Sequence, residues 1–171
     1  MKLFLALIFC ATLLLGGITL AQSQPDQKSL STVASKAEYI HVNDYDPKRD
    51  AAADINNAVA AAAQSHRRVL VEIGGKWCIW CTYLDKFFDQ NVALRKFRDE
   101  NFVTVKVNFS AENKNETTIA HYGKVEGYPH IFVLDAEGKL LHSQDTSKLE
   151  EGRGYSTQAI ANFLEKWKPK S

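Results

Sequence analysis

The chain contains little sulfur and almost no excess charge. Only three of its 171 residues are Cys, and 21 Lys and Arg residues against 20 Asp and Glu residues leave a formal net charge of +1. Such a balance gives no reason to expect nucleic acid or an anionic membrane surface as a partner. After the first 21 residues no apolar run approaches the length of a membrane span, and no internal repeat divides the chain.

Metal and haem sites lack ligands in this sequence. Zinc is commonly held by four Cys or His side chains, whereas one of the three Cys lies in the N-terminal apolar stretch and the five His residues have no ligand-like spacing. Covalent haem attachment needs a His directly after a Cys-x-x-Cys motif, and Thr82 occupies that position. We therefore expect no metal and no cofactor.

Residues 1–21 have the pattern of a secretory signal peptide. Lys2 precedes an almost wholly apolar stretch that ends at the small residue Ala21. Cleavage after Ala21 would remove Cys10 together with the segment. The alternative is an uncleaved membrane anchor, because the stretch is close to spanning length. In both cases the remaining chain is exported, into a bacterial periplasm in the simplest interpretation, where disulfides form and persist.

The exported part divides into a tether and one domain. Residues 22–38 are rich in Ser, Gln and Lys and have no apolar periodicity, which is typical of a flexible tether. Residues 39–171 have the ordinary size of a single domain.

The domain alternates strand and helix patterns. Val69–Ile73 is a short, nearly continuous apolar run, which is typical of a strand covered on both faces. Further strands are expected at Phe102–Asn108, at His130–Leu134, at Lys139–His142 and, as an edge strand, at Tyr39–Val42. Helices are expected at Lys48–Ser65, Cys78–Asn91, Ala93–Asp99, Asn115–Tyr122 and Ser156–Lys168.

Three further sequence signals concern the segments that connect these strands and helices. Asp46 followed by Pro47 predicts the start of the first helix. The turn 135–138 predicts a hairpin between the third and fourth main strands. Lys148–Tyr155, with two Gly and two Glu, is expected to be a mobile loop before the last helix.

The motif Trp77-Cys78-Ile79-Trp80-Cys81 holds the two remaining thiols one helical turn apart, behind a buried strand. Once Cys10 is removed, only one intramolecular pairing is possible. The layout is typical of a dithiol that opens and closes as a disulfide.

Residues 51–167 resemble a thioredoxin-fold protein, most closely the exported bacterial thioredoxin-like proteins with a Trp-Cys-x-x-Cys active site. The resemblance rests on the motif itself, on Glu72 six residues before the first Cys, on Lys106 in the next strand, and on Tyr128-Pro129 before the hairpin. It implies an α/β thioredoxin fold, with a central mixed sheet of four to five strands flanked by helices.

The two thiols are expected to have different roles. Cys78 at a helix start lies near unpaired N–H groups and the positive end of the helix dipole, which favours its thiolate and makes it the attacking thiol. Cys81, one turn further on, would resolve the mixed disulfide. A purely structural disulfide is the alternative, although a loop this short restrains little chain entropy.

Glu72 interrupts a strand that should be buried. Burial would raise its pKa, and from beneath Cys81 it would exchange a proton with that thiol. The family commonly has Asp here, so the longer side chain changes the distance. The alternative is a solvated Glu at a strand end. Lys106 is expected either to pair with Glu72 or to point to solvent.

Trp77, Trp80, Tyr128 and Pro129 are the candidate substrate-binding residues. By the resemblance, Pro129 follows a cis peptide bond and leaves the Tyr128 backbone open to an extended substrate, whereas a trans proline starting a strand is the alternative. Trp77 is expected beside the disulfide. Trp80 either forms an apolar rim for a protein substrate or packs in the core.

The residues between the thiols bear on the direction of electron flow. Ile79 and Trp80 place no cation there, so the thiolate of Cys78 has one stabiliser fewer. We therefore expect a reduction potential nearer the reducing end of such proteins, about −270 mV, than the oxidising end, about −120 mV.

These features predict an exported thiol-disulfide oxidoreductase that reduces or exchanges protein disulfides. Its partners would be exported proteins with disulfides and a redox protein that recharges the dithiol, and a membrane only if the signal is uncleaved. The alternative is a thioredoxin-fold binding or chaperone module that senses oxidation or delivers copper without turnover.

Overall fold

A computed structural model describes residues 39 and 41–170, so the expected signal peptide 1–21 and tether 22–38 lie outside the described residues. Four strands form the main sheet, in the order β2-β1-β3-β4. In chain order these strands are β1 Arg68–Gly74, β2 Phe102–Asn108, β3 His130–Leu134 and β4 Leu140–Asp145. Strands β1 and β2 are parallel, whereas β3 is antiparallel to both β1 and β4. The sheet is therefore mixed, as predicted.

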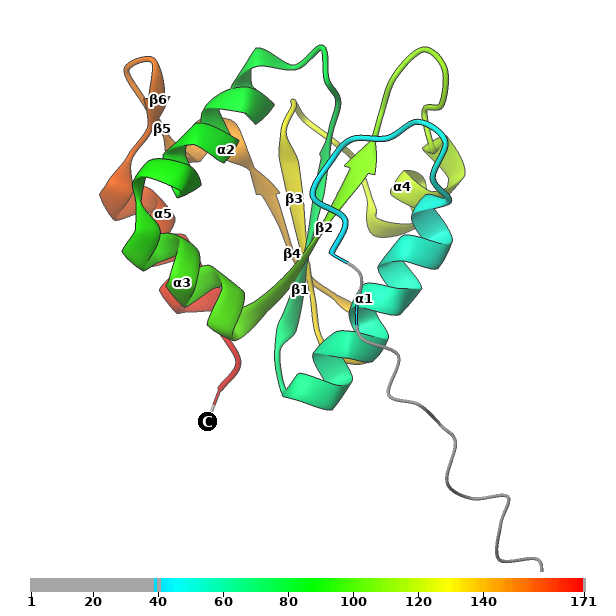
Figure 1. The fold of residues 1–171 in the computed structure, drawn as a ribbon, viewed down its shortest axis with the longest axis horizontal. Coiled ribbons are helices and arrows are strands. Elements are labelled where there is room, and N and C mark those ends of the chain that lie inside the picture. The colour runs from blue at the N-terminus through cyan, green and yellow to red at the C-terminus, as the bar shows by residue number, and fades with distance from the viewer. Residues whose placement is uncertain (1–38, 40, 171) are drawn as a thin grey trace, which may run out of the picture. The chain divides into compact units, whose positions relative to one another are not determined.

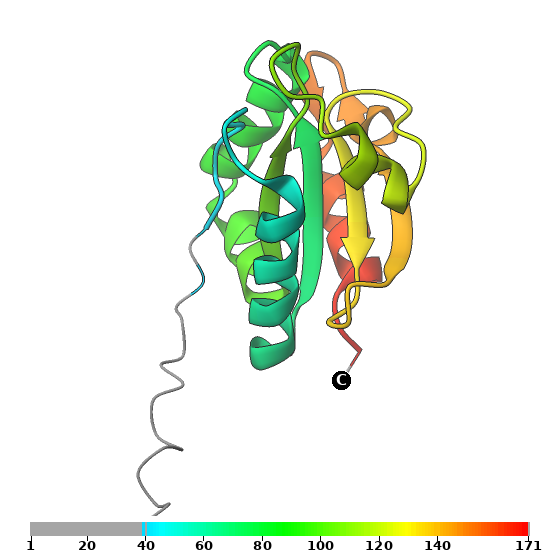
Figure 2. The ribbon, with the colours of Figure 1, turned by 90° about the vertical axis from the view of Figure 1, so that its right-hand side faces the viewer.

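Helices cover both faces of this sheet (Figure 1). Their bounds are α1 Ala51–Ser65, α2 Ile79–Gln90, α3 Val92–Asn101, α4 Glu116–Tyr122 and α5 Thr157–Trp167. Helices α1 and α4 lie on one face, which is turned toward the viewer in Figure 2. Buried side chains of α2 and α5 pack on the other face.

The alternation of β1 decides which side chains meet which helices. Val69, Val71 and Ile73 belong to the core beneath α1 and α4. Leu70 belongs to the core beneath α2 and α5. Because side chains alternate along a strand, Glu72 shares the face of Leu70 and points toward the layer of α2.

The first helix begins later than predicted. Asp50 caps it, with its carboxylate accepting from the backbone N–H groups of Ala52 and Ala53 at 3.0 and 3.1 Å. Asp46 instead closes a separate turn, in which its side chain accepts from the Lys48 N–H at 2.9 Å. The prediction of a helix from Lys48 was wrong because the second Asp, four residues on, provides the cap.

The segment Lys148–Tyr155 is also different from the prediction. It contains the end of a 3₁₀ helix, Thr146–Leu149, and a hairpin formed by β5 Glu150–Glu151 and β6 Gly154–Tyr155. Leu149 and Tyr155 are buried in the core beneath α2 and α5. These two anchors give the segment regular structure, so the expectation of a mobile loop was wrong.

The remaining bounds agree closely with the sequence patterns. Strands β2 and β3 have the predicted bounds, and the hairpin before β4 is present with Gly138 at a φ of 83°. The predicted edge strand Tyr39–Val42 is reduced, among its described residues, to a single parallel bridge between Val42 and Val105 of β2.

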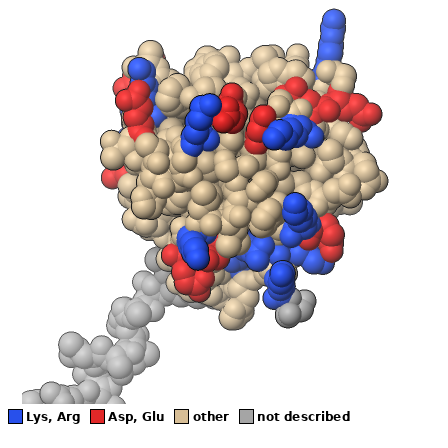
Figure 3. All heavy atoms as spheres, turned by 180° about the vertical axis from the view of Figure 1, so that it is seen from behind, with Lys and Arg blue, Asp and Glu red and all other residues tan. Residues whose placement is uncertain are grey.

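The described residues show neither a membrane-spanning helix nor, on the face in Figure 3, a surface of one charge sign. No helix among them is both long and apolar enough to cross a membrane. On the face seen in Figure 3, basic and acidic side chains lie beside one another.

Candidate active site

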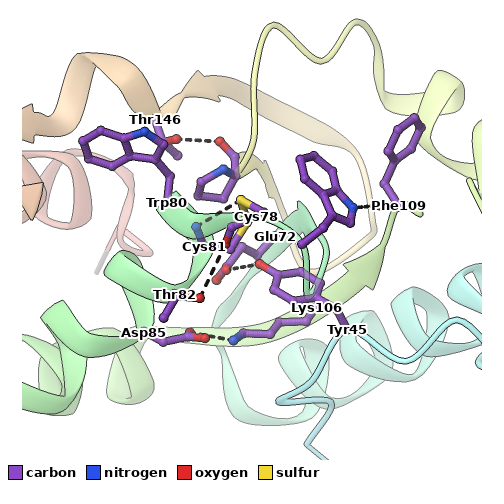
Figure 4. Close-up of a disulfide and its surroundings, with 12 residues drawn as sticks. Tyr45, Glu72, Cys78, Trp80, Cys81, Thr82, Asp85, Lys106, Phe109 and Thr146 are labelled. Carbon is purple, nitrogen blue, oxygen red and sulfur yellow. Dashed lines mark hydrogen bonds and ion pairs between the residues drawn. A yellow bond between two sulfur atoms is a disulfide. The ribbon is translucent and has the colours of Figure 1, made fainter. Parts of the chain in front are cut away.

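The two Cys residues of the motif are joined by a disulfide at the start of α2 (Figure 4). Cys78 is the N-cap of the helix, and its Sγ accepts a hydrogen bond from the Cys81 N–H at 3.0 Å. Both residues are buried, with 4% and 2% of their surface exposed. The N–H of Cys81 lies where it would stabilise a thiolate on Cys78, together with the helix dipole.

Gly74 and Gly75 allow the chain to turn from β1 into this helix. A Cβ atom added at Gly74 would lie 2.5 Å from the Cys81 Sγ and 2.8 Å from the Tyr45 hydroxyl. The backbone of β1 therefore runs so close beneath the disulfide that only glycine fits there. The turn is closed by a hydrogen bond from the Cys78 N–H to the Gly75 carbonyl at 2.9 Å.

Glu72 lies in the layer beneath this turn and is only 4% exposed, so it is not a solvated strand-end residue. Its Oε1 accepts a hydrogen bond from the Tyr45 hydroxyl. Burial raises the pKa of the Glu72 carboxyl, while the nearby positive charge of Lys106 opposes that rise. The site thus contains a carboxyl group whose protonated form is favoured by its surroundings.

Lys106 lies opposite Glu72 in the strand register, yet it pairs with another residue. Its Nζ forms an ion pair with the Asp85 Oδ1 of α2 at 2.5 Å. The same Nζ lies 4.9 Å from the centroid of the Tyr45 ring. Lys106 therefore matches neither expectation, since it does not pair directly with Glu72 and its mostly buried side chain does not point freely to solvent.

An apolar rim borders Cys78. Trp77 and Ile79 are each 57% exposed, which is unusual for large apolar side chains. The Trp77 Nε1 donates to the Phe109 carbonyl at 2.7 Å, and its ring meets that of Tyr128 edge-on at 5.3 Å. Phe109 and Tyr128 stack at 4.9 Å, and Tyr128 packs against the cluster of the two Cys residues.

Pro129 follows Tyr128 at the start of β3. The peptide bond between them is cis. The Pro129 carbonyl accepts a hydrogen bond from the Thr146 Oγ1 at 2.5 Å, which links this segment to the 3₁₀ helix after β4.

Trp80 is held in an aromatic cluster. Its ring meets those of Tyr83 and Tyr155 edge-on at 5.3 and 5.9 Å, and its carbonyl accepts from the Tyr155 hydroxyl at 3.4 Å. The side chain is half-buried, so the expected core packing applies to part of it, and its role as a rim for a protein substrate stays a prediction. One part packs against the core, and the other borders the surface beside the disulfide.

Three residues of the site were not among the sequence candidates: Tyr45, Asp85 and Thr146. Tyr45 lies in the connection before α1, and Asp85 lies within the pattern of an amphipathic helix. Their contacts join distant segments, and no spacing or motif in the sequence points to them. Among the described residues, no three His, Cys, Asp or Glu side chains converge to hold a metal ion.

A mixed sheet with helices on both faces, and a Cys-x-x-Cys disulfide at the start of one of those helices, define a protein of thioredoxin fold with a dithiol–disulfide site. The predicted α/β fold class is therefore confirmed. The chain belongs to the thioredoxin-like family, whose sequence model matches residues 50–136.

Two relatives are similar to this chain in sequence or structure. It is 31% identical over 93 residues to the disulfide bond reductase DsbH of Chlamydia pneumoniae. That match covers 49% of this chain and 55% of the relative, so the chain spans about half the length of that curated protein. The crystal structure of a disulphide isomerase from Xylella fastidiosa Temecula1 is 28% identical, with a TM-score of 0.61, and the match covers 74% of this chain and 97% of that one.

Proposed function

We propose that the protein is an exported thiol-disulfide oxidoreductase that reduces or exchanges disulfides of exported proteins. The observation that carries the proposal is the Cys78–Cys81 disulfide at the start of α2, with the buried carboxyl of Glu72 in the layer beneath it. The resemblance to a disulfide bond reductase and to a disulphide isomerase supports the same class of reaction.

The reaction proceeds in two steps in the reducing direction. The Cys78 thiolate attacks one sulfur of a substrate disulfide, so a Cys78–substrate disulfide forms and the other substrate sulfur leaves as a thiolate. Cys81 then loses its proton and attacks the Cys78 sulfur. The Cys78–Cys81 disulfide closes, and the first substrate sulfur leaves as a thiolate. Two electrons pass from the dithiol to the substrate, and the proton from Cys81 becomes available to a leaving thiolate.

Glu72 is the proposed acceptor of the Cys81 proton. A carboxyl group with a raised pKa exchanges protons near neutral pH more readily than one at its ordinary value. Lys106 acts on this step only through its charge, which lowers the pKa of Glu72 and thereby opposes burial.

The substrate is proposed to be a polypeptide that lies across the apolar rim. Trp77, Ile79 and Tyr128 offer exposed or half-exposed apolar surface next to Cys78. Aromatic and apolar surface of this kind suits an unfolded or extended segment around a disulfide. A second redox protein returns electrons to the pair, and neither step needs a cofactor.

Insulin-disulfide reduction with dithiothreitol tests the proposal. The protein without residues 1–21 is compared with its Cys78→Ser variant, which keeps the fold but lacks the attacking sulfur. We expect rapid precipitation of reduced insulin only with the unmodified chain. Equal rates for the two proteins would contradict the enzymatic function, and tight stoichiometric copper binding by the reduced form would then favour a binding module.

The reduction potential tests the direction. Equilibration with glutathione or dithiothreitol buffers should place the Cys78–Cys81 couple nearer about −270 mV than about −120 mV. A value at the oxidising end would reverse the proposed direction and make the protein an oxidant of thiols.

A further inference from the structure

The Glu72 carboxylate receives its hydrogen bond from a residue outside the matched family region. Tyr45 precedes residues 50–136, yet it is 4% exposed and packs against Cys78 and Cys81. Its hydroxyl donates to the Oε1 of Glu72. Figure 4 shows the Tyr45 ring beside Glu72, below the disulfide.

Two further contacts limit where the Tyr45 ring can lie. The hydroxyl and the Cys81 Sγ both approach the position of a Cβ on Gly74, at 2.8 and 2.5 Å, so they converge over the same glycine. The Nζ of Lys106, which is bound to Asp85, lies over the ring at 4.9 Å from its centroid. The ring therefore has little room to move without opening the site.

We propose that Tyr45 is a positioning residue whose hydroxyl holds the Glu72 carboxylate in the orientation in which it exchanges a proton with Cys81. The inference rests on the proposed function. With Oε1 occupied by the hydroxyl, Oε2 remains as the oxygen that takes the proton. The Cys81 thiol gives its proton to Glu72, and its thiolate then attacks the Cys78 sulfur and expels the substrate thiolate. Tyr45 keeps its own proton throughout.

The chemistry of the surrounding groups agrees with this assignment. Burial, and the negative charge of Glu72, raise the pKa of the Tyr45 hydroxyl well above its ordinary value, so it remains a donor. The other charges that act on Glu72 are Lys106 of β2, Asp85 of α2 and Arg98 of α3. Its register partner in β3, Ile131, is apolar. Tyr45 is thus the one described hydrogen-bond donor on the carboxylate.

The test separates the two chemical steps. Reduced protein is mixed with excess DTNB, and thionitrobenzoate release is followed by stopped flow. The first phase, which depends on DTNB concentration, reports attack by Cys78. The second, which does not, reports closure of the disulfide by Cys81. Tyr45→Phe keeps the ring and removes only the hydroxyl.

We expect Tyr45→Phe to change the second phase selectively. Loss of a donor to the carboxylate raises the pKa of Glu72, so the pH midpoint of the second phase moves up by about one unit. Disordering of the proton acceptor slows that phase about tenfold at neutral pH. The first phase stays within about twofold of the unmodified protein, because attack by the Cys78 thiolate needs no proton transfer to Glu72.

Two controls keep this interpretation specific. Tyr39→Phe removes another hydroxyl of the same N-terminal region, one that donates to the Thr104 carbonyl at 3.2 Å, and should leave both phases unchanged. In a Glu72→Gln background, Tyr45→Phe should have no further effect. An unchanged second phase in Tyr45→Phe, an equal slowing of both phases, or an additional effect on Glu72→Gln would each overturn the proposal.

A measurement on the unmodified chain completes the test. In an NMR titration of the reduced protein, the Glu72 carboxyl carbon and the Tyr45 ring should shift with one common midpoint. A Tyr45 ring that is insensitive to Glu72 titration would overturn the inference. If instead Cys78→Ser reacts with DTNB as fast as the unmodified protein, the proposed function itself fails, and the two failures are distinct.

Discussion

Glu72 places a buried carboxyl group on the face of the sheet that packs against α2 and α5, next to the apolar Leu70 and Ile131. Burial disfavours its charged form, whereas the charge of Lys106, the Tyr45 hydroxyl and the charge of Arg98 act in the opposite direction. A carboxyl so placed reduces the stability of the fold when it is ionised. The proposed function gives this carboxyl group a role, which is proton exchange with Cys81.

The first prediction concerns the loss of stability that ionised Glu72 causes. The folded chain keeps the proton on Glu72 at pH values at which the unfolded chain, with an ordinary pKa of 4.5, has lost it. The free energy of unfolding should therefore fall as pH rises from the ordinary to the raised pKa. Glu72→Gln stays neutral and should be more stable than the unmodified protein above this window, by about 1.4 kcal/mol for each unit of raised pKa.

Urea unfolding of the oxidised proteins across the pH range measures this difference. It should disappear below the ordinary pKa of Glu72, where both side chains are neutral. Glu137→Gln, at an exposed hairpin position, is the matched control and should follow the unmodified protein. A destabilised Glu72→Gln at alkaline pH would show that the ionised carboxylate contributes to folding.

The second prediction concerns the close packing around Gly74. A methyl group there would meet Cys81 and Tyr45 at distances that no relaxed contact allows. Gly74→Ala should lower the free energy of unfolding by about 1–3 kcal/mol, as other overpacked sites do. Gly127→Ala, with no atom within 4 Å of the added Cβ, should change it little. Equal urea midpoints for the two variants would contradict the close approach of β1 to the disulfide.

At this scale, spacing along the backbone was enough to place some residues and not others. Cys78 and Cys81 share a turn because they are three residues apart at a helix start, and Glu72 keeps its face because β1 alternates. Tyr45 lies 27 residues from Glu72, and Asp85 lies 21 from Lys106. Contacts over such separations depend on how the elements pack, which no local pattern contains.

At the scale of elements, α2 carries most of the site and is tied to its neighbours by polar links. The Asp85–Lys106 ion pair joins it to β2, and the Tyr155 hydroxyl joins its Trp80 carbonyl to the β5–β6 hairpin. These links position the first turn of the helix relative to the sheet and to the apolar rim.

The Asp85–Lys106 link gives the third prediction. Asp85 raises the pKa of Glu72, and Lys106 lowers it. Asp85→Asn should therefore move the pH midpoint of the disulfide-closing step down, and Lys106→Met should move it up, each with the direction set by the charge removed. The stopped-flow second phase measures both. Shifts in the same direction would mean that the variants act by disturbing α2 rather than by charge.

A comparison of the predicted and observed bounds of helices and strands shows which sequence signals were sufficient to place them. Strands β2 and β3 were predicted at their observed bounds because their apolar patterns end at polar or turn residues. The β5–β6 hairpin was missed because its strands have only two residues each, and burial of Leu149 and Tyr155 holds them in place. The start of α1 was misplaced because two Asp residues compete as caps, and the second is the one that forms the bonds.

At the scale of the whole molecule, the described domain belongs to the thioredoxin-like family, and its proposed work depends on export. A dithiol that exchanges with protein disulfides meets its substrates in an oxidising compartment. We propose, from the signal-peptide pattern of residues 1–21, that the chain is directed there.

The fourth prediction follows from that pattern. When the full chain is expressed in a bacterium, the periplasmic fraction should contain a protein whose first residue is Gln22, because cleavage is expected after Ala21. Mass spectrometry of the intact protein measures this. A full-length chain that remains in the membrane fraction would instead support an uncleaved anchor.

The central claim is that Cys78 attacks and Cys81 resolves. It is tested most directly by mixing reduced single-Cys variants with insulin and measuring disulfide-linked adducts by mass spectrometry under non-reducing conditions. We predict that Cys81→Ser accumulates an adduct through Cys78, because the resolving sulfur is missing, whereas Cys78→Ser accumulates little. An adduct that forms as readily on Cys78→Ser, or none on Cys81→Ser, would contradict the account.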